Sequence, residues 1–351
     1  MKRLTIASLI SLVLLVACSS STGQTDPFGP FPSGPLSWAP PRCGDPQHQC
    51  VDLYLSNTGA HQAPSLDDNT DYRIHLPANR PLFGGITING GHSVQIIGGE
   101  IDLTFPCSND ASDCMGIYIS KDSPGAVFVE GVYIRNIVSI GRTCPSGVSD
   151  TSQTCSSGDG IDVNTADDGT INVNVITLEN VRIDGISGCS GYGDHADVFQ
   201  PYQAPDDTIR IDRLTGTTNC QGLTLDPDLA YSVWHTFPAS ITVQNANIEV
   251  TANPYGNNAY GYGWWLTHGT GCQSGQLHLS NDYVSEPPPG AVTNAVWPYP
   301  TCGARYSHGA FSWPGSRISG SLRVGVPLGG DFVPADTVGA GYQSPGYQSQ
   351  G

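Results

Sequence analysis

Lysine is almost missing from this 351-residue chain, and positive charge is scarce altogether. Only Lys2 and Lys121 occur, and Lys and Arg together number 14 against 31 Asp and Glu, which gives a net charge of −17. A surface this acidic repels phosphate backbones and anionic membrane surfaces. We therefore expect no nucleic-acid partner, and we expect the chain to be a monomer.

A membrane-spanning apolar run is also missing. The mostly apolar stretch from Leu4 to Val16 is too short to span a bilayer as a helix. It follows the basic Met1-Lys2-Arg3 and ends in small residues, which is typical of a secretory signal peptide. The run Leu15-Val16-Ala17-Cys18 resembles the lipobox of bacterial lipoproteins. That resemblance implies export and lipidation of Cys18, which would anchor the protein to the outer membrane or the cell surface. The alternative is an ordinary signal peptide with an incidental cysteine.

Zinc and redox spacings of the CxxC type are absent from the cysteines. Apart from Cys18, ten cysteines remain, an even number that indicates a disulfide framework in an exported chain. Several successive cysteines enclose short polar loops. We therefore predict five local bridges between successive pairs: Cys43–Cys50, Cys107–Cys114, Cys144–Cys155, Cys189–Cys220 and Cys272–Cys302.

Helical periodicity is hard to find anywhere after the N-terminal region. Residues 1–17 are predicted to be the signal peptide, and the Ser-, Pro- and Gly-rich residues 18–42 a flexible tether. Residues 43–330 are predicted to be one domain with caps at 43–81 and 286–330, and residues 331–351 a tail. The 43 Gly and 27 Pro fit many turns between short strands.

Short alternating apolar runs recur about six times along this domain. Each unit has a first run that usually begins with glycine and an aliphatic residue, and a second run follows it. One such unit cannot bury its own apolar face, whereas stacked units form a continuous core. The inward residues of the first runs are predicted to be Ile86, Ile117, Ile161, Val198, Leu223 and Trp264.

The runs GIYIS, GIDVN, VFVEGVYIRN and VITLENVRIDG resemble the repeats of right-handed parallel β-helix proteins of the pectin-lyase-like class. The likeness covers about residues 70–285. It implies an all-β fold, a single-stranded right-handed parallel β-helix of about six or more coils with capping segments. A β-sandwich or propeller fits the irregular repeat less well. Asn136, Asn180 and Asn245 fall at comparable places in the second runs and are expected to form a partial ladder.

Polar and aromatic residues gather on the outward side of the first runs, where β-helix enzymes commonly hold carbohydrate. The run GDHADVFQPYQ is the least typical, because Asp197 is predicted to stand where the other runs carry glycine. Aromatic faces and polar groups together suit sugars. The predicted substrate-binding residues are Tyr118, Phe199, Gln200, Tyr202, Gln203 and Trp265.

Acidic residues from adjacent coils form the predicted catalytic cluster: Asp159, Asp162, Asp194, His195 and Asp197. Neighbouring carboxylates separate one another's pKa values, which provides an acid beside a base for glycoside hydrolysis. His195 could act as a general acid or base. The same oxygens could instead bind Ca²⁺ as a cofactor, or could simply cap turns and bond neighbouring coils.

Lyase chemistry is a second option, because Lys121 or Arg210 could serve as the base. The two belong to different runs, so they are expected to lie far apart. The NTD…DD…GHG pattern of polygalacturonases is absent. The sequence thus predicts an exported protein that binds and cleaves polysaccharide, as a glycoside hydrolase or polysaccharide lyase. The alternative is a non-catalytic surface protein that binds glycan, adheres or serves as a coat element.

Overall fold

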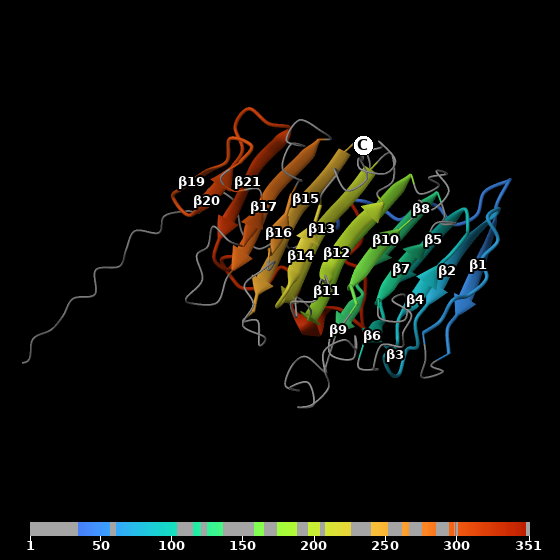
Figure 1. The fold of residues 1–351 in the computed structure, drawn as a ribbon. Helices are drawn as coiled ribbons and strands as arrows, with labels where there is room; N and C mark the ends of the chain where they lie inside the picture. The colour runs from blue at the N-terminus through green and yellow to red at the C-terminus, as the bar shows by residue number, and fades with distance from the viewer. Residues whose placement is uncertain are drawn as a thin grey trace, which may run out of the picture. The chain divides into compact units, whose positions relative to one another are not determined.

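The computed structural model describes residues 34–56, 61–103, 115–120, 125–135, 158–164, 174–187, 196–203, 208–225, 240–251, 262–266, 276–285, 295–297, 299 and 301–348. For Asn164, Tyr202 and Gln203 only the backbone is described. The fold is the predicted parallel β-helix, and its strands stack in chain order from β1 to the β19–β21 end (Figure 1). Apart from one 3-10 turn, η4 (Ala335–Thr337), the described elements are all strands. Within these residues no helix has the length and apolarity to cross a bilayer.

The first runs form one parallel sheet, here called the seven-stranded sheet. Each coil contributes one of its strands, and the chain crosses through the other sheet between one strand and the next. In stacking order they are β4 (Ile86–Ile88), β7 (Ile117–Ser120), β10 (Ile161–Asn164), β12 (Asp197–Gln203), β14 (Gln221–Thr224), β16 (Trp264–Trp265) and β18 (Val296–Trp297).

The second runs form the fourteen-stranded sheet, which is parallel except at its C-terminal end. Its main path is β1 (Gln49–Tyr54), β2 (Thr70–His75), β5 (Ser93–Ile97), β8 (Ala126–Glu130), β11 (Val175–Ile186), β13 (Thr208–Thr218), β15 (Ser240–Val250), β17 (Leu277–Ser285), β21 (Ile318–Val324), β20 (Ala310–Ser312) and β19 (Arg305–Ser307). A branch of it holds β3 (Leu82–Phe83), β6 (Glu100–Asp102) and β9 (Tyr133–Arg135).

A column of residues with positive φ bends the fourteen-stranded sheet at the same place in each coil. Gly98 and Gly131 occupy it in the early coils. Asn180, Arg213, Asn245 and Asn281 continue it along β11, β13, β15 and β17. Glycine and asparagine tolerate this left-handed conformation better than other residues do, so the column explains why these types recur there.

A side-chain ladder runs along part of this column, as expected, but with different members. The Asn281 amide donates to Asn245 Oδ1 at 2.7 Å, and the Asn245 amide donates to Asp212 Oδ1 at 2.8 Å. Asn180 lies in the same column, whereas Asn136 is outside the described residues. The ladder is therefore built from Asn245 and Asn281, and the sequence reading missed Asn281.

The core is the space that the two sheets enclose, and aliphatic side chains stacked in register fill it. The first-run register joins Ile86, Ile117, Ile161, Phe199, Leu223, Trp264 and Val296, all of them fully buried. The expected alignment was wrong at one rung, because Phe199 and not Val198 stands in this row. The row also extends to Val296, which the sequence reading had assigned to the C-terminal cap.

Both ends of the described chain pack on the outer face of the fourteen-stranded sheet. Residues 34–42 and 331–348, here called the terminal clasp, pair with each other through Leu36, whose N–H donates to Gly346 O and whose carbonyl accepts from Gln348 N. Tyr342 and Tyr347 each donate to Glu130 at 2.6 Å. The described part of the expected tether, residues 34–42, therefore lies against the solenoid.

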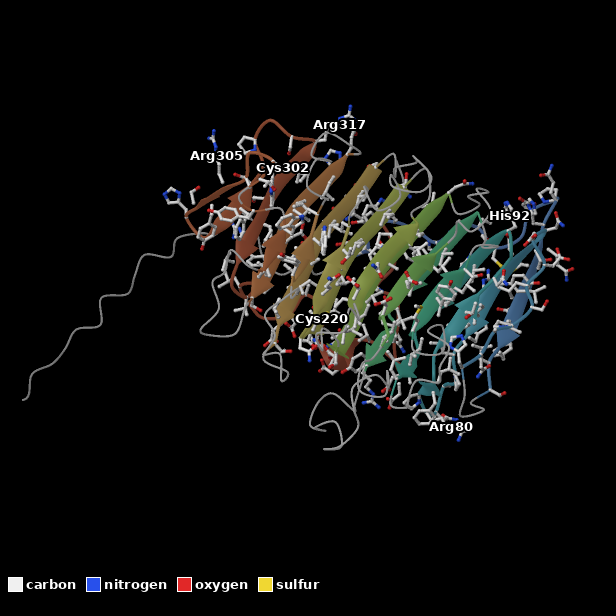
Figure 2. The ribbon with its side chains drawn as sticks, viewed as in Figure 1. Arg80, His92, Cys220, Cys302, Arg305 and Arg317 are labelled. Carbon is white, nitrogen blue, oxygen red and sulfur yellow. A yellow bond between two sulfur atoms is a disulfide. The ribbon has the colours of Figure 1, made fainter. Side chains whose placement is uncertain are left out.

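Disulfides are present at three described places. Cys43 and Cys50 are joined as predicted, with their Cα atoms 5.2 Å apart. Cys220 and Cys302 are also disulfide-bonded. Cys220 lies beside the middle of the stack, and Cys302 lies at the β19–β20 end (Figure 2).

Candidate functional site

One outward-facing column crosses the whole seven-stranded sheet. Each member immediately follows the buried residue of its strand, so successive members are neighbours at the strand spacing of about 4.8 Å. Tyr118, Gln200, Trp265 and Trp297 are half-buried, whereas Asp162 and Thr224 are buried. The column is Thr87, Tyr118, Asp162, Gln200, Thr224, Trp265 and Trp297.

Three of the predicted acidic residues meet beneath the middle of this column. Asp159 and Asp197 lie two residues before the inward side chains Ile161 and Phe199, so they stack on each other in adjacent coils. The Asp197 N–H donates to Asp159 Oδ1 at 2.7 Å, and the Thr224 hydroxyl donates to Asp197 Oδ1. Asp162, Asp159 and Asp197 are exposed by only 3%, 4% and 0%.

Burial raises the pKa of all three carboxyl groups in this acid cluster. Burial is the main cause at Asp159 and raises its pKa to about 7. At Asp162 and Asp197 the pKa is raised first by burial and then by the charge of Asp159. The cluster therefore holds protons at neutral pH, because three ionised carboxylates cannot share so small an apolar volume.

Among the described residues, two carboxylate oxygens of the acid cluster have no hydrogen-bond partner. These are Asp162 Oδ1 and Asp197 Oδ2. Buried polar atoms are nearly always bonded, so an orphaned pair in one cluster needs an explanation. A cluster that retains free acceptors and protons beneath an outward polar column has the chemistry of a general acid and base.

An aromatic cluster continues the column toward the C-terminal end of the sheet. Tyr262 lies 5.4 Å from Trp265 and 5.7 Å from Trp297 between ring centroids, and the two tryptophans are 6.4 Å apart. Trp265 was a predicted binding residue, but Trp297 was missed. The signal for Trp297 was the dipeptide Val296-Trp297, which matches Trp264-Trp265 one coil earlier.

The other predicted binding residues have mixed outcomes. Tyr118 and Gln200 lie in the outward column on either side of Asp162. The prediction for Phe199 was wrong: it is fully buried among the core aliphatics, because the register of β12 turns it inward. Outside the described residues lie Asp194, His195, Cys18 and Lys121 and the side chains of Tyr202 and Gln203.

The glycine position of the first runs also needs correction. Gly116, Gly160 and Gly222 precede the inward residue, and a Cβ on Gly160 would approach Val198 O to 2.6 Å. The register places Val198, not Asp197, in this glycine row. Asp197 stands one position earlier, directly against Asp159, and this position explains how its carboxyl enters the acid cluster.

Neither metal binding nor elimination chemistry gains support from this face. Within the described ranges, no group of three or more His, Cys, Asp and Glu side chains is placed to hold a metal ion, so the acid cluster gives no support for Ca²⁺. None of the seven strands carries Lys, Arg or His. Arg210, the described candidate base of a lyase, belongs to β13 in the other sheet, where its guanidinium lies 5.7 Å from the Trp38 ring centroid.

Comparisons of the chain with protein-family models, with curated proteins and with solved structures gave no match.

Proposed function

We propose that this protein is an exported, lipid-anchored member of the pectin-lyase-like β-helix class. It binds a polysaccharide along the outer face of the seven-stranded sheet and hydrolyses it with the acid cluster. The signal-peptide and lipobox pattern that ends at Cys18 supports the export and anchoring part. The part that concerns binding rests on the geometry of the sheet.

The outward column from Tyr118 to Trp297 is the single observation that carries the proposal. It places amide, hydroxyl and carboxyl groups next to three clustered aromatic rings on one straight face. Flat aromatic rings provide apolar contact for sugar rings, and the neighbouring polar groups can bond their hydroxyls. A straight row at the strand spacing suits an extended chain better than a compact ligand.

Hydrolysis fits the acid cluster better than elimination does. Glycoside hydrolysis needs one protonated and one ionised carboxyl group, and raised pKa values at Asp159, Asp162 and Asp197 provide both forms near neutral pH. Elimination needs a base and a cation that neutralises the uronate. The seven strands hold no basic residue, and the chain carries a net charge of −17, which disfavours a polyanionic substrate.

The depth of the acid cluster supports a second candidate, a non-catalytic glycan-binding protein. Asp162 is the member that belongs to the outward column, yet only 3% of it is exposed. Cleavage therefore requires that sugar binding expose the Asp162 carboxyl group. Binding through the aromatic cluster requires no such change, since Trp265 and Trp297 are only half-buried.

A binding assay tests the first part of the proposal. Untagged protein would be incubated with insoluble neutral and acidic polysaccharides, and wild type would be compared with Trp265→Ala and Trp297→Ala. We expect retention on at least one neutral polysaccharide and a loss of about tenfold or more in each variant, roughly 1.4 kcal/mol. Tyr54→Ala is the matched control, because Tyr54 is 73% exposed and lies on β1, outside the seven-stranded sheet. Unchanged binding in both tryptophan variants would contradict the proposal.

A cleavage assay then separates the two candidates. The polysaccharide that binds would be assayed for new reducing ends and for unsaturated products, with wild type, Asp162→Asn and Asp197→Asn. New reducing ends that disappear in either variant while binding persists support the hydrolase. Binding without any product supports the non-catalytic candidate, and unsaturated products would overturn the choice of hydrolysis over elimination.

A further inference from the structure

The last strands of the solenoid carry basic residues and no acidic ones. Residues 287–330, which hold β18 to β21, contain three Arg and no Asp or Glu, although the whole chain has a net charge of −17. Arg305 and Arg317 lie at this end of the stack (Figure 2). Both are exposed, and neither forms an ion pair with another described residue. This end therefore presents positive charge that the rest of the acidic chain does not neutralise.

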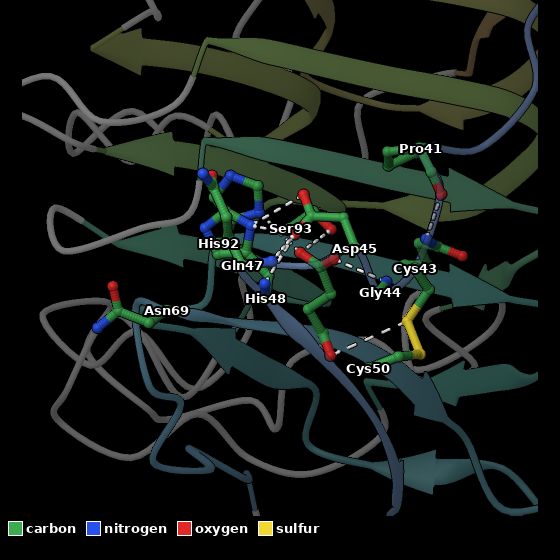
Figure 3. A network of polar contacts seen from close by, with 12 residues as sticks. Pro41, Cys43, Gly44, Asp45, Gln47, His48, Cys50, Asn69, His92 and Ser93 are labelled. Atoms are coloured by element: carbon green, nitrogen blue, oxygen red, sulfur yellow. Dashed lines mark hydrogen bonds and ion pairs between the residues drawn. A yellow bond between two sulfur atoms is a disulfide. The ribbon is translucent and has the colours of Figure 1, made fainter.

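The opposite end of the stack has the reverse balance of charge. Residues 43–81, which hold β1 and β2, contain five Asp and two Arg. Two histidines there, His48 and His92, stack with their ring centroids 3.5 Å apart. Each is bonded to a carboxylate, His48 to Asp45 at 3.0 Å and His92 to Asp71 at 2.8 Å (Figure 3). The solenoid is thus acidic at its N-terminal end and basic at its C-terminal end.

Exposed apolar side chains also gather at the C-terminal end. Of the five large apolar side chains that are exposed among the described residues, three lie here: Tyr306 is 40% exposed, Val326 71% and Leu328 74%. Pro327, between the two aliphatic residues, is buried, so both of its neighbours project into solvent on the same side of the loop. Single exposed apolar residues are common on a protein surface, whereas a group of them marks a contact surface.

Backbone contacts hold the basic and the apolar residues together. The Val324 N–H donates to Gly309 O at 2.8 Å, so the turn that carries His308 lies beside the start of loop 325–330. That loop is closed by the Gly330 N–H, which donates to Pro327 O at 3.0 Å. The exposed residues of this region are here called the C-terminal tip: Arg305, Tyr306, His308, Val326 and Leu328.

We propose that the C-terminal tip docks on a bilayer surface that contains anionic lipids. Val326 and Leu328 enter the headgroup region, and the Arg305 guanidinium bonds lipid phosphates. Apolar side chains beside basic ones are the combination that binds the interfacial layer of a membrane. A soluble polyanion would use the arginine but would leave the two aliphatic side chains in water. The proposal rests on the lipid anchoring proposed above, because so small a surface binds only weakly by itself.

The negative net charge of the chain does not oppose this contact. At physiological ionic strength, charges separated by more than about 8 Å are largely screened from each other. Strands stack at about 4.8 Å, so acidic residues more than two strands from the tip have little effect on its lipid contact. Asp331, the first acidic residue after the tip, bonds Arg182 Nη1 at 2.8 Å. The acidic N-terminal end is repelled by the same surface, which orients the solenoid with its tip toward the bilayer.

The length of chain before the solenoid allows the tip to reach an anchoring bilayer. Gly34, the first described residue, accepts from Arg213 on β13, and β13 is three strands from β21. Gly34 follows Cys18 by sixteen positions, which can span roughly 50 Å. The three strand steps cover only about 14 Å. A lipid on Cys18 would therefore keep the tip at a high local concentration near the surface, where a weak contact is sufficient.

Vesicle sedimentation tests the tip without the anchor. The full chain with Cys18→Ser, which has no lipidation site, would be mixed with vesicles of phosphatidylcholine, with or without phosphatidylglycerol. We expect binding to the anionic vesicles, a loss of at least tenfold in Val326→Ser/Leu328→Ser, and a loss of about fivefold in Arg305→Gln. The substituted side chains are exposed, so the fold should be retained. Arg73→Gln is the matched control, because Arg73 is exposed on β2 at the acidic end.

Hydrogen exchange on the wild-type chain locates the contact independently of any variant. Anionic vesicles should slow exchange in residues 305–309 and 325–330 and leave β1 unchanged. The proposal is overturned if the tip variants bind as tightly as their parent, if β1 is protected instead of the tip, or if neutral vesicles bind as tightly as anionic ones. It is also overturned if the chain forms dimers that Val326→Ser/Leu328→Ser dissociates, because a second copy would then cover the tip.

Failure of this proposal can be told apart from failure of the proposed function. The vesicle assay contains no polysaccharide and uses a chain without lipid, so a negative result refutes the tip alone. The mass of the exported wild-type chain shows separately whether Cys18 carries lipid.

Discussion

The backbone N–H of Asp197 donates to Asp159 Oδ1 at 2.7 Å, and this bond joins the acidic residues of two successive coils. It sets the two carboxyl groups into one buried volume with Asp162. The contact arises because β10 and β12 pair in register, so the residues two positions before Ile161 and Phe199 meet.

Asp159→Asn should reduce the loss of stability that accompanies rising pH. The Asp159 pKa is raised from 3.8 to about 7 in the folded chain, so its contribution to stability is full below about pH 4 and is lost as pH rises through 7. Asparagine does not ionise, and its carbonyl can still accept from the Asp197 N–H. The free energy of unfolding should therefore exceed that of wild type at pH 8 by roughly 1–4 kcal/mol.

Urea unfolding at pH 5, 7 and 8.5 would measure this difference. Asp336→Asn serves as the control, since Asp336 lies in the exposed 3-10 turn η4. If the free energies of unfolding of wild type and Asp159→Asn change in parallel with pH, Asp159 ionises in the folded chain as freely as in the unfolded one.

Glu179→Gln should keep residues 34–42 bound to the solenoid at alkaline pH. Burial, followed by the charges of Asp212 and Glu130, raises the Glu179 pKa to about 8. Its Oε1 accepts from the Trp38 N–H at 2.7 Å, and the groups that face this region are Glu130, Asp212, Arg213, Tyr342 and Tyr347.

Because the pKa of Glu179 is raised in the folded chain, its contribution to folding stability is full below about pH 4.5 and is lost as pH rises through 8. In wild type, amide hydrogen exchange of residues 34–42 should accelerate from pH 6 to pH 9 beyond the intrinsic chemical rate. Glu179→Gln should remove this excess, and Glu249→Gln, on an exposed side chain of β15, should leave it unchanged. Equal excess exchange in all three proteins would refute the role of Glu179.

Asn245→Ala should destabilise the fold more than Asn245→Gly does. Asn245 has φ of 55° and links Asn281 to Asp212 through its side chain. Both variants lose these bonds, at about 1–3 kcal/mol, whereas only alanine adds the penalty of a left-handed backbone, about 1–2 kcal/mol. Thermal and chemical unfolding of the two variants would separate the cost of the lost hydrogen bonds from the backbone penalty. Equal losses of stability in both variants would mean that the left-handed backbone at residue 245 carries no cost.

Gly160→Ala should destabilise the stack by several kcal/mol or prevent folding. A Cβ there would lie 2.5 Å from Ile183 Cγ2 and 2.6 Å from Val198 O, and a stacked coil has little room to yield. Gly341→Ala is the control, since a Cβ at Gly341 meets nothing within 4 Å. The two variants would be compared by expression yield and melting temperature. Similar values for Gly160→Ala and Gly341→Ala would show that the coils at Gly160 can move apart.

Much of the fold was predictable because a solenoid repeats its local pattern. The glycine-plus-aliphatic starts predicted the inward row correctly at Ile86, Ile117 and Ile161. They were misaligned by one residue at β12, where Val198 and Phe199 are both apolar and equally able to face the core. Short apolar runs carry no signal that separates these registers, so only pairing with Ile161 and Leu223 decides them.

The candidate site, like the fold, was predictable from the sequence only in part. Asp159, Asp162 and Asp197 were grouped correctly, because residues at one position of successive coils must stack. Their burial was not foreseen, since exposure depends on what covers the sheet. Trp297 was missed because a strand of only two residues, Val296–Trp297, is too short to recognise without its partner Trp264–Trp265.

The chain's own pattern determined that alternating runs with glycine and asparagine turns stack into a parallel β-helix, because no single run can bury its apolar side alone. It also determined which coils contribute carboxyl groups to one place. The tertiary structure alone decided that Phe199 faces the core, that Asp197 meets Asp159, and that two aromatic residues join Trp265 on one face. It alone brought His48 beside His92 as well. These outcomes depend on register and on contacts between residues distant in sequence, which local composition does not encode.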